Sequence, residues 1–314
     1  MQTTTNTRAF IESEQYSAFI LQILHDGLLP ENFYRNVGDF GSGDTLHIKT
    51  VGSVAIQEAA EDTPLIYSPI ESGEVTLRMT DYKGDAWYVT DDLREDGEQV
   101  DTLMTQRSIE STRAIQENFE TRILETANEG QVDADPNTIN DFPHRIASTA
   151  TNGVFALNQL IRMKLAFDKA NVPSAGRIFV CDPVVEAALN GLVAISNDVT
   201  PFAERILESG MQSGENRFIM NLYGWDIMTS NRLPKGTFSD GTTEITDGVA
   251  NICMSILDDQ TKPLMAAWRR MPKMEGDRNK DLARDEYVTR CRYGLGVQRT
   301  DTLGVIITSA VNFE

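Results

Sequence analysis

A single long helix dominates the pattern of apolar and polar positions along the chain. No Pro or Gly interrupts residues 98–129, which are rich in good helix formers, and Gly130 follows where a left-handed cap ends a helix. The apolar side chains of this stretch keep one narrow stripe: Val100, Leu103, Met104, Ile115, Phe119, Ile123 and Ala127. The pattern predicts a helix over residues 98–128 that lies along a sheet.

Two strands and a long insertion precede this helix. Residues 45–49 alternate between apolar and polar, and residues 73–90 alternate again, with residues 83–85 as a bulge or turn. Between them, residues 51–69 offer no apolar core. We expect two long strands joined by an excursion that the domain cannot bury, in the form of a projecting ribbon. Further upstream, helical spacing predicts an amphipathic helix that packs on its own chain or on another copy: Tyr16, Phe19, Ile20, Ile23 and Leu24.

The second half of the chain has an α/β pattern. Helical spacing over residues 152–168 is followed by a short apolar run, residues 178–181, that suits a strand covered on both faces. Asp182 and Pro183 then supply an N-cap and a first-turn proline for another helix. A polar loop is expected over residues 235–248. Further strands are expected at residues 218–222, 225–229, 252–257, 287–293 and 297–308, the last two joined near residues 294–296.

Composition and charge narrow the function. The chain has 314 residues, 40% of them hydrophobic, which is enough for two packed cores. A net charge of −19 argues against a general nucleic-acid binder, because phosphate binding depends on Lys and Arg. The three cysteines lie far apart and fit reduced, buried thiols. No stretch has the form of a signal peptide or the length of a membrane span, so we expect no membrane contact.

The charge is unevenly distributed along the chain. Residues 91–129 hold eleven Asp and Glu against four Arg, whereas residues 262–299 hold ten Lys and Arg against five Asp and Glu. The two segments could meet, either within one chain or across subunits. If they pair across subunits, added salt should weaken assembly, because salt screens exposed charges.

No group of residues has the pattern of a catalytic or cofactor site. The three histidines, His25, His47 and His144, do not lie near another ligand type at metal spacing. Residues 133–141 imitate part of a calcium loop, but Thr138 replaces its glycine and His144 its bidentate glutamate, which favours a linker. We therefore expect no catalytic residue, no cofactor and no metal, and no enzymatic activity.

Three segments in this order carry a resemblance to a known family: residues 176–183, 224–234 and 287–308. The chain resembles tailed-phage major capsid proteins of the Hong Kong 97 fold, which is an α+β fold. The resemblance implies an N-terminal arm with an amphipathic helix (1–43), an extended loop formed by a β-ribbon (44–91), a peripheral domain with a long spine helix (92–150), an inserted α/β axial domain (151–260) and return strands of the peripheral domain (261–314).

The resemblance also implies a function and partners. The chain would be a shell subunit that assembles with many copies of itself, as hexamers and pentamers, around the double-stranded DNA genome of a tailed bacteriophage. It would be part of the virion, assembled in the host cytoplasm, and would touch packaged DNA without sequence-specific contacts. Because no long helical leader precedes Thr45, a separate scaffolding protein is expected, with a portal protein and cement or decoration proteins as further partners.

The resemblance points to a set of assembly contacts in the extended loop, the long helix and the basic segment. They are Glu58, Glu61, Asp62, Ile66, Tyr67, Arg107, Arg113, Arg269 and Arg270. Two alternatives stay open at the level of sequence. One is an encapsulin-like shell that encloses cargo, and the other is a two-domain α/β enzyme or binding protein with a cleft beside Asp182.

Overall fold

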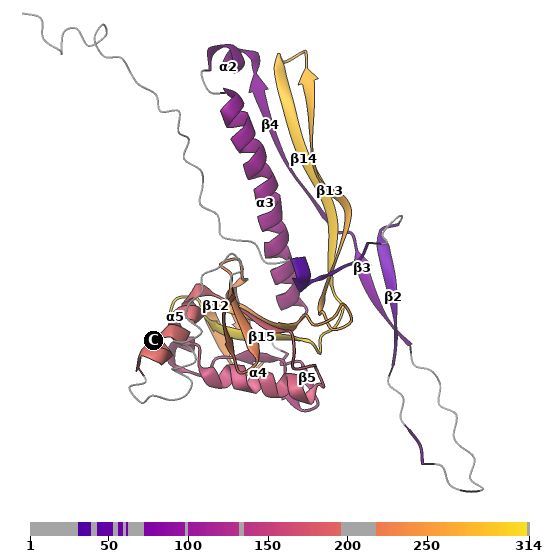
Figure 1. Ribbon diagram of the computed structural model, residues 1–314, viewed down its shortest axis with the longest axis vertical. Helices are drawn as coiled ribbons and strands as arrows, with labels where there is room; N and C mark the ends of the chain where they lie inside the picture. The colour runs from indigo at the N-terminus through magenta and orange to yellow at the C-terminus, as the bar shows by residue number, and fades with distance from the viewer. Residues whose placement is uncertain are drawn as a thin grey trace, which may run out of the picture.

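The protein is an α+β subunit with two sheets and a projecting ribbon (Figure 1). The structure, a computed structural model, describes residues 31–38, 43–52, 56–58, 61, 72–97, 100–131, 135–195 and 218–312. One long helix lies along a four-stranded sheet, and a seven-stranded sheet with two helices forms the other end of the molecule. The predicted N-terminal helix lies outside the described residues.

The long helix, α3 (Val100–Glu129), confirms the prediction for this stretch. It lies along a sheet of order β1-β13-β14-β4: β1 (Arg35–Asn36), β13 (Leu264–Asn279), β14 (Arg284–Val297) and β4 (Asp81–Thr90). Phe119 packs its ring 4.7 Å from Trp268 and 5.1 Å from Tyr293, measured between centroids. Leu103, which the sequence placed on the buried stripe, is 51% exposed, so the core of this unit lies along the C-terminal half of the helix.

The ribbon consists of β2 (Thr45–Val51) paired antiparallel with β3 (Ser72–Arg78). The two predicted strands are therefore confirmed, but the second ends at Arg78, and the chain continues as β4 beside β14 in the four-stranded sheet. The bulge or turn expected at residues 83–85 is wrong, since these residues lie inside β4. A Cβ at Gly84 would lie 2.7 Å from the carbonyl oxygen of Thr289, so this glycine permits close approach of β14.

The second sheet has the order β7-β15-β12-β8-β10-β9, with β11 paired to β12. Its strands are β7 (Arg145–Ala147), β8 (Arg177–Cys181), β9 (Phe218–Leu222), β10 (Trp225–Thr229), β11 (Lys235–Ser239), β12 (Glu244–Ser255) and β15 (Leu303–Ser309). Two helices accompany it: α4 (Leu157–Lys169) and α5 (Pro183–Ile195). The parallel pair of β8 and β10 gives this unit its α/β character.

Several local predictions for this unit are confirmed. Every residue of β8 is buried, as expected of a strand covered on both faces. Asp182 caps α5, because its Oδ2 accepts the backbone N–H of Val184 at 3.1 Å. Tyr223 and Gly224, with φ of 53° and 84°, form the tight turn between β9 and β10.

Other local predictions are wrong because a distant contact decides the structure. Residues 235–248 are largely a hairpin, β11 and β12, whose turn is held by the Asp240 carboxylate accepting the N–H groups of Thr242 and Thr243 at 2.9 and 2.7 Å. The turn expected near residues 294–296 is part of the straight strand β14. A Cβ at Gly296 would lie 2.9 Å from Met265 Cε, so this glycine allows packing between strands.

Two further boundaries shift. The helix expected from residue 152 begins at Leu157, after a 3₁₀ turn, η2 (Thr151–Gly153). The segment compared with a calcium loop contains a short hairpin, β5 (Thr138–Ile139) and β6 (Phe142–Pro143).

Sheet membership differs from the division of the chain implied by the resemblance. β15 pairs with β12 from Gly248 to Met254 and with β7, so both β15 and β7 lie in the seven-stranded sheet. The resemblance had grouped them with the peripheral domain. β4, grouped with the extended loop, pairs along its whole length with β14.

A buried arginine joins the end of α3 to the seven-stranded sheet. The Nε of Arg145 donates to the carbonyl oxygen of Ser239 at 2.7 Å. Its Nη1 donates to Asn128 Oδ1 at 3.0 Å and to the carbonyl oxygen of Gln131 at 2.8 Å. The guanidinium therefore links Asn128 on α3 and Gln131 just after it to β7 and β11.

We expect Arg145→Ala to lower the free energy of unfolding by roughly 3–5 kcal/mol, because two buried acceptors and one half-buried acceptor lose their donor and a cavity remains. Urea denaturation followed by circular dichroism measures the change. Arg162→Ala, at an exposed position on α4, is the matched control and should stay within about 0.5 kcal/mol of the wild type. Equal effects of the two substitutions would contradict the role of Arg145.

His144 is buried in the seam between α4 and β15. Its ring stacks on Phe167, with centroids 5.6 Å apart, and its Nδ1 lies 3.3 Å from the carbonyl oxygen of Phe142. Among the described residues, its Nε2 has no hydrogen-bond partner. Burial therefore lowers the pKa of His144 below its ordinary value of 6.5.

This burial predicts acid sensitivity. Below pH 6.5 the unfolded chain takes up a proton at His144 that the folded chain does not, so the free energy of unfolding falls as the pH falls, by at most about 1.4 kcal/mol per pH unit. His144→Leu should show a shallower fall between pH 7.5 and 5.5 in urea denaturation. His25 and His47 are present in both proteins and cancel in the comparison. Parallel pH curves would contradict the assignment to His144.

Candidate assembly surfaces

The face of the four-stranded sheet that points away from α3 is open to solvent. Thr289 and Tyr293 of β14 point toward the helix, with hydroxyl contacts to Ser111 at 3.4 Å and Asn118 at 3.3 Å. The alternate side chains therefore point away from it. We call this surface the solvent face. It has four rows that each cross β4, β14 and β13, and the rows run from the ribbon toward the hairpin tip: Tyr82, Arg292 and Arg270; Gly84, Arg290 and Lys273; Ala86, Val288 and Glu275; and Tyr88, Glu286 and Asp277.

The ribbon projects away from both sheets, with its root packed and its far end exposed (Figure 1). Leu77 and Met79 pack against Met265 and Ala267 at the root. Beyond the paired strands, Ile56 is 98% exposed. The ribbon thus carries apolar and polar side chains to a position where its own chain does not cover them.

The sequence-predicted contacts are spread over three places. Glu58 and Glu61 are exposed on the segment beyond the ribbon. Asp62, Ile66 and Tyr67 lie outside the described residues. The structure therefore does not bring the predicted set together within one subunit.

The four predicted arginines all have contacts within the chain. Arg107 binds Asp85 at 2.8 Å, and Arg113 binds Glu117 at 3.1 Å on the same helix face. Arg270 binds Glu275 at 2.7 Å, and Arg269 donates to the carbonyl oxygen of Gly43. Contact of these residues with another subunit stays a prediction.

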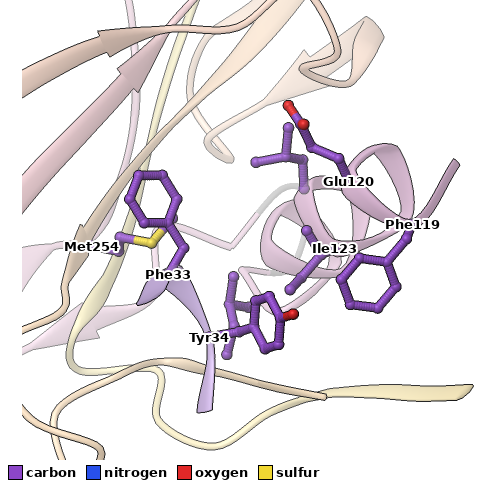
Figure 2. Close-up of a pocket in the computed structure, with 8 residues that line it drawn as sticks. Phe33, Tyr34, Phe119, Glu120, Ile123 and Met254 are labelled. Atoms are coloured by element: carbon purple, nitrogen blue, oxygen red, sulfur yellow. The ribbon is translucent and has the colours of Figure 1, made fainter. Parts of the chain in front are cut away.

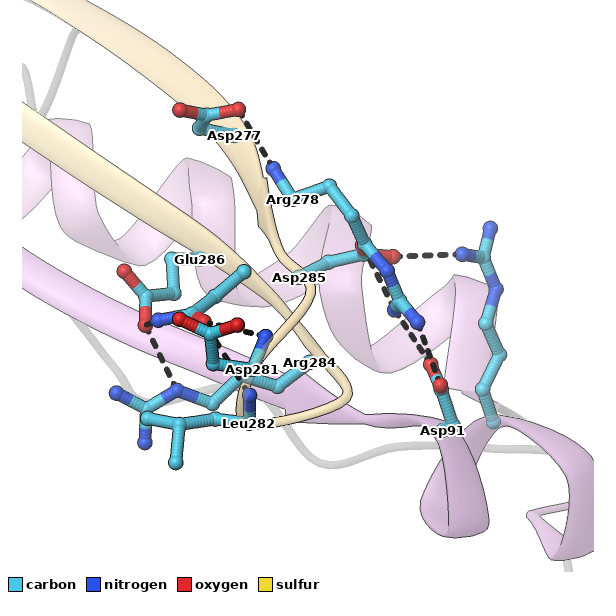
Figure 3. A network of polar contacts seen from close by, with 10 residues as sticks. Asp91, Asp277, Arg278, Asp281, Leu282, Arg284, Asp285 and Glu286 are labelled. Carbon is cyan, nitrogen blue, oxygen red and sulfur yellow. Dashed lines mark hydrogen bonds and ion pairs between the residues drawn. The ribbon is translucent and has the colours of Figure 1, made fainter.

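The acidic and basic segments meet within one chain (Figure 3). Arg278, near the tip of the β13–β14 hairpin, makes a two-pronged contact with Asp91, the first residue of α2 (Asp91–Asp96), and also contacts Asp285 at 3.2 Å. Arg94 binds Asp285 at 2.7 Å. The network ties α2 to the hairpin tip, so here opposite charges are satisfied without a second subunit.

A second group of contacts stiffens the same tip. Glu286 accepts from Asn279 Nδ2 at 3.0 Å and from Arg284 Nε at 2.7 Å, and the Arg284 guanidinium lies 4.4 Å from the centroid of the Tyr88 ring. The hydrogen bond from Arg278 lowers the pKa of Asp91, and those from Asn279 and Arg284 lower the pKa of Glu286.

An apolar pocket lies where the N-terminal segment, α3 and the two sheets join (Figure 2). Its cavity volume is about 40 Å³, and its lining residues are Phe33, Tyr34, Phe119, Glu120, Ile123, Leu124, Met254 and Leu264. The buried Glu120 carboxylate accepts from Ser230 Oγ at 3.1 Å and lies 3.6 Å from Arg232 Nη1. The one carboxylate of this pocket is therefore paired within the chain.

The part of the chain that the structure describes holds no group of three or more His, Cys, Asp or Glu placed to bind a metal. Burial raises the pKa of the Cys181 and Cys253 thiols, which makes them poor nucleophiles. Within the same residues, no helix has both the length and the apolar character needed to span a bilayer.

Comparison with known proteins identifies the family. The sequence profile of the phage capsid protein family matches residues 73–308, which is more than half of the chain. The chain belongs to the phage capsid protein family. The match includes the long helix, three of the four strands of the four-stranded sheet and almost all of the seven-stranded sheet.

Solved structures of low sequence identity share the capsid fold. A structure from Mycobacterium phage Che8 is 18% identical, with a TM-score of 0.68 over 94% of this chain and 97% of that chain. The capsid of cyanophage P-SCSP1u is also 18% identical, with a TM-score of 0.68 over 98% and 95%. The capsid of the native GTA particle is 12% identical, with a TM-score of 0.63 over 99% and 100%. No curated protein sequence matches the chain.

These findings settle the class of protein. The expected Hong Kong 97-type α+β fold is confirmed, and the chain is a major capsid protein, one of many copies that form a virion shell. The family is one of phage capsid proteins, which decides against the two-domain enzyme or binding protein and gives no support to the encapsulin-like compartment.

Sequence reasoning named Arg270 as an assembly contact but missed the other cations of the solvent face, Lys273, Arg290 and Arg292. It assigned no strand to residues 264–279, so the positions of Lys273 and Arg290 relative to each other were not foreseen. The signal was present in β14, where Arg290 and Arg292 alternate with Cys291 and Tyr293.

We expect Asp91→Asn to loosen α2 from the hairpin tip. Hydrogen exchange of the α2 amides should become several-fold faster at pH 7, because Arg278 loses its ion pair with Asp91 and keeps only the one with Asp285. Arg278 holds the pKa of Asp91 below the ordinary carboxyl value of 3.8, so the contact is present above pH 3.8 and is lost only as the pH falls through the lowered pKa, where wild type and variant should converge. Asp92→Asn is the control. Unchanged exchange in Asp91→Asn would contradict the proposed tie.

Proposed function

We propose that this major capsid protein assembles as hexamers and pentamers around the double-stranded DNA genome of a tailed bacteriophage, with the ribbon of each copy lying over a neighbour. One observation carries this proposal: the β2–β3 ribbon is a separate two-stranded sheet whose far segment is exposed, including Ile56 at 98%. An isolated ribbon is only marginally stable in water, so a neighbouring copy supplies the missing cover.

Different segments of the chain have different roles in the proposed assembly. We assign the arm role to residues 1–43, the ribbon to residues 44–78, the peripheral body to α3 with the four-stranded sheet, and the axial role to the seven-stranded sheet with α4 and α5. This division follows the sheets, and moves β4, β7 and β15 relative to the ranges 44–91, 92–150 and 261–314 expected from the sequence. The axial unit of each copy meets the others around the centre of a capsomer.

The remaining partners belong to the same proposal. They are a separate scaffolding protein, a portal protein and cement or decoration proteins, with assembly in the host cytoplasm. The role of the chain is structural and not enzymatic. A net charge of −19 fits a shell that holds DNA without sequence-specific contacts and without sticking to it.

Assembly tests the proposal directly. Mass photometry and negative-stain microscopy of the expressed chain, alone and with the genes encoded beside it, should show closed particles. Replacing residues 53–70 by a two-residue Asn-Gly turn should leave the circular dichroism spectrum and melting temperature nearly unchanged but abolish closed particles, because the ribbon loses the segment that reaches a neighbour. A wild-type chain that stays a monomer or dimer under all these conditions would overturn the proposal.

A further inference from the structure

The solvent face of the four-stranded sheet is electrically polarised. Its two rows nearest the ribbon carry four cations, Arg270, Lys273, Arg290 and Arg292, and its next two rows carry three acids, Glu275, Asp277 and Glu286. Arg284, at the hairpin tip, lies on the same face and binds Glu286. In a protein with a net charge of −19, four cations on adjacent positions form a distinct local surface. We call Lys273, Arg290 and the sheet beneath them the basic patch.

Two of the four cations are already paired. Arg270 binds Glu275 at 2.7 Å, and Arg292 binds Asp44 at 2.9 Å. Lys273 and Arg290 are exposed and face each other across β13 and β14, and neither makes an ion pair with any described residue. The basic patch therefore has two charges available for a partner.

The strand next to the basic patch, β4, carries small residues on this face. Gly84 of β4 lies opposite Arg290 in the register, and a Cβ there would meet Arg290 Cγ at 3.3 Å. Ala86, two residues along β4, adds another small side chain to the same face. The missing side chain at Gly84 therefore gives room to β14 and the stem of Arg290, and Arg290 itself stays exposed.

The ribbon carries the opposite charge. Residues 50–77 hold five Asp and Glu and no Lys or Arg. Of these acids, Glu58 and Glu61 are exposed. They follow β2 in the sequence, and the ribbon of β2 and β3 projects away from the four-stranded sheet of its own chain (Figure 1). Each copy thus presents both an acidic end and a basic patch, and cannot easily join the two by itself.

We propose that Glu58 and Glu61 of one copy bind Lys273 and Arg290 of a neighbouring copy. This inference rests on the proposed overlap of the ribbon with a neighbour and names the surface that receives it. A second copy is favoured over nucleic acid as the occupant, because each added copy brings one acidic end and one basic patch, and because the strongly negative chain repels DNA overall.

Charge reversal tests the proposal. The double variants Glu58→Lys with Glu61→Lys, and Lys273→Glu with Arg290→Glu, should each raise the critical concentration for particle formation by roughly tenfold in 50 mM salt, since each exposed pair contributes a factor of a few. Light scattering and mass photometry give this concentration. In 500 mM salt the difference from the wild type should shrink to about twofold, because the charges are screened.

Combining the two double variants restores complementarity and should return the critical concentration to within about twofold of the wild type. The matched control combines Lys273→Glu and Arg290→Glu with Glu95→Lys and Asp96→Lys on α2, which restores the net charge but not the pairing, and should rescue nothing. Equal rescue by both combinations would overturn the proposal, as would unimpaired assembly of either double variant. If the wild type still forms particles in that case, only the proposed ion pairs are contradicted and the shell function is not.

A second measurement serves if the free chain forms no particles. A peptide of residues 55–62 should bind the folded chain in low salt, by fluorescence anisotropy, and binding should be lost with Lys273→Glu and Arg290→Glu and with a peptide carrying lysine at positions 58 and 61. No binding of the wild-type peptide would overturn the proposal. Particles of the Lys273→Glu and Arg290→Glu variant that assemble normally but lose bound DNA would also overturn it, in favour of nucleic acid as the occupant.

Discussion

The buried guanidinium of Arg145 holds this subunit together as one body. At the end of α3 the exposed Glu129 lies between two buried polar residues, Asn128 and Gln131, which need partners away from water. Arg145 and the side chain of Gln131, which donates to the carbonyl oxygen of Leu303 at 2.7 Å, connect that end to β7, β11 and β15. The two sheets share no strand, so these polar contacts, with the apolar core around Phe119 and Met254, fix how they sit together.

Around this rigid body, three parts of the subunit are exposed: the ribbon, the solvent face and the N-terminal half of α3. Each of them depends for its stability on the core beneath it or on contact with another molecule. A capsid subunit needs this combination, because each copy must keep its shape while offering several different surfaces to its neighbours. The hairpin tip shows the limit of this rule: its charges are paired within the chain, so opposite sign alone does not mark a contact between subunits.

Sequence reasoning succeeded where structure is decided locally. The helix α3 follows from 30 residues without Pro or Gly, and β8 with its Asp182 cap follows from a short apolar run and two residues. It failed where contact with a segment far away in the sequence determines the local structure. Gly84 and Gly296 were read as turns, but each accommodates a neighbouring strand. β13 was missed because Pro272, dense charge and two register shifts hide its alternation, and the basic patch was missed with it.

The apolar pocket between Phe33, Ile123 and Met254 lies at the junction of the two sheets, so its size limits how far the two halves of the subunit can move relative to each other. Its cavity volume is about 40 Å³, which is room for no more than a few water molecules, so the junction between the two sheets is nearly filled. A close-packed junction resists bending, because small displacements force atoms into contact. Adaptation to different positions in a shell must therefore come from the segments that project from this body, such as the ribbon.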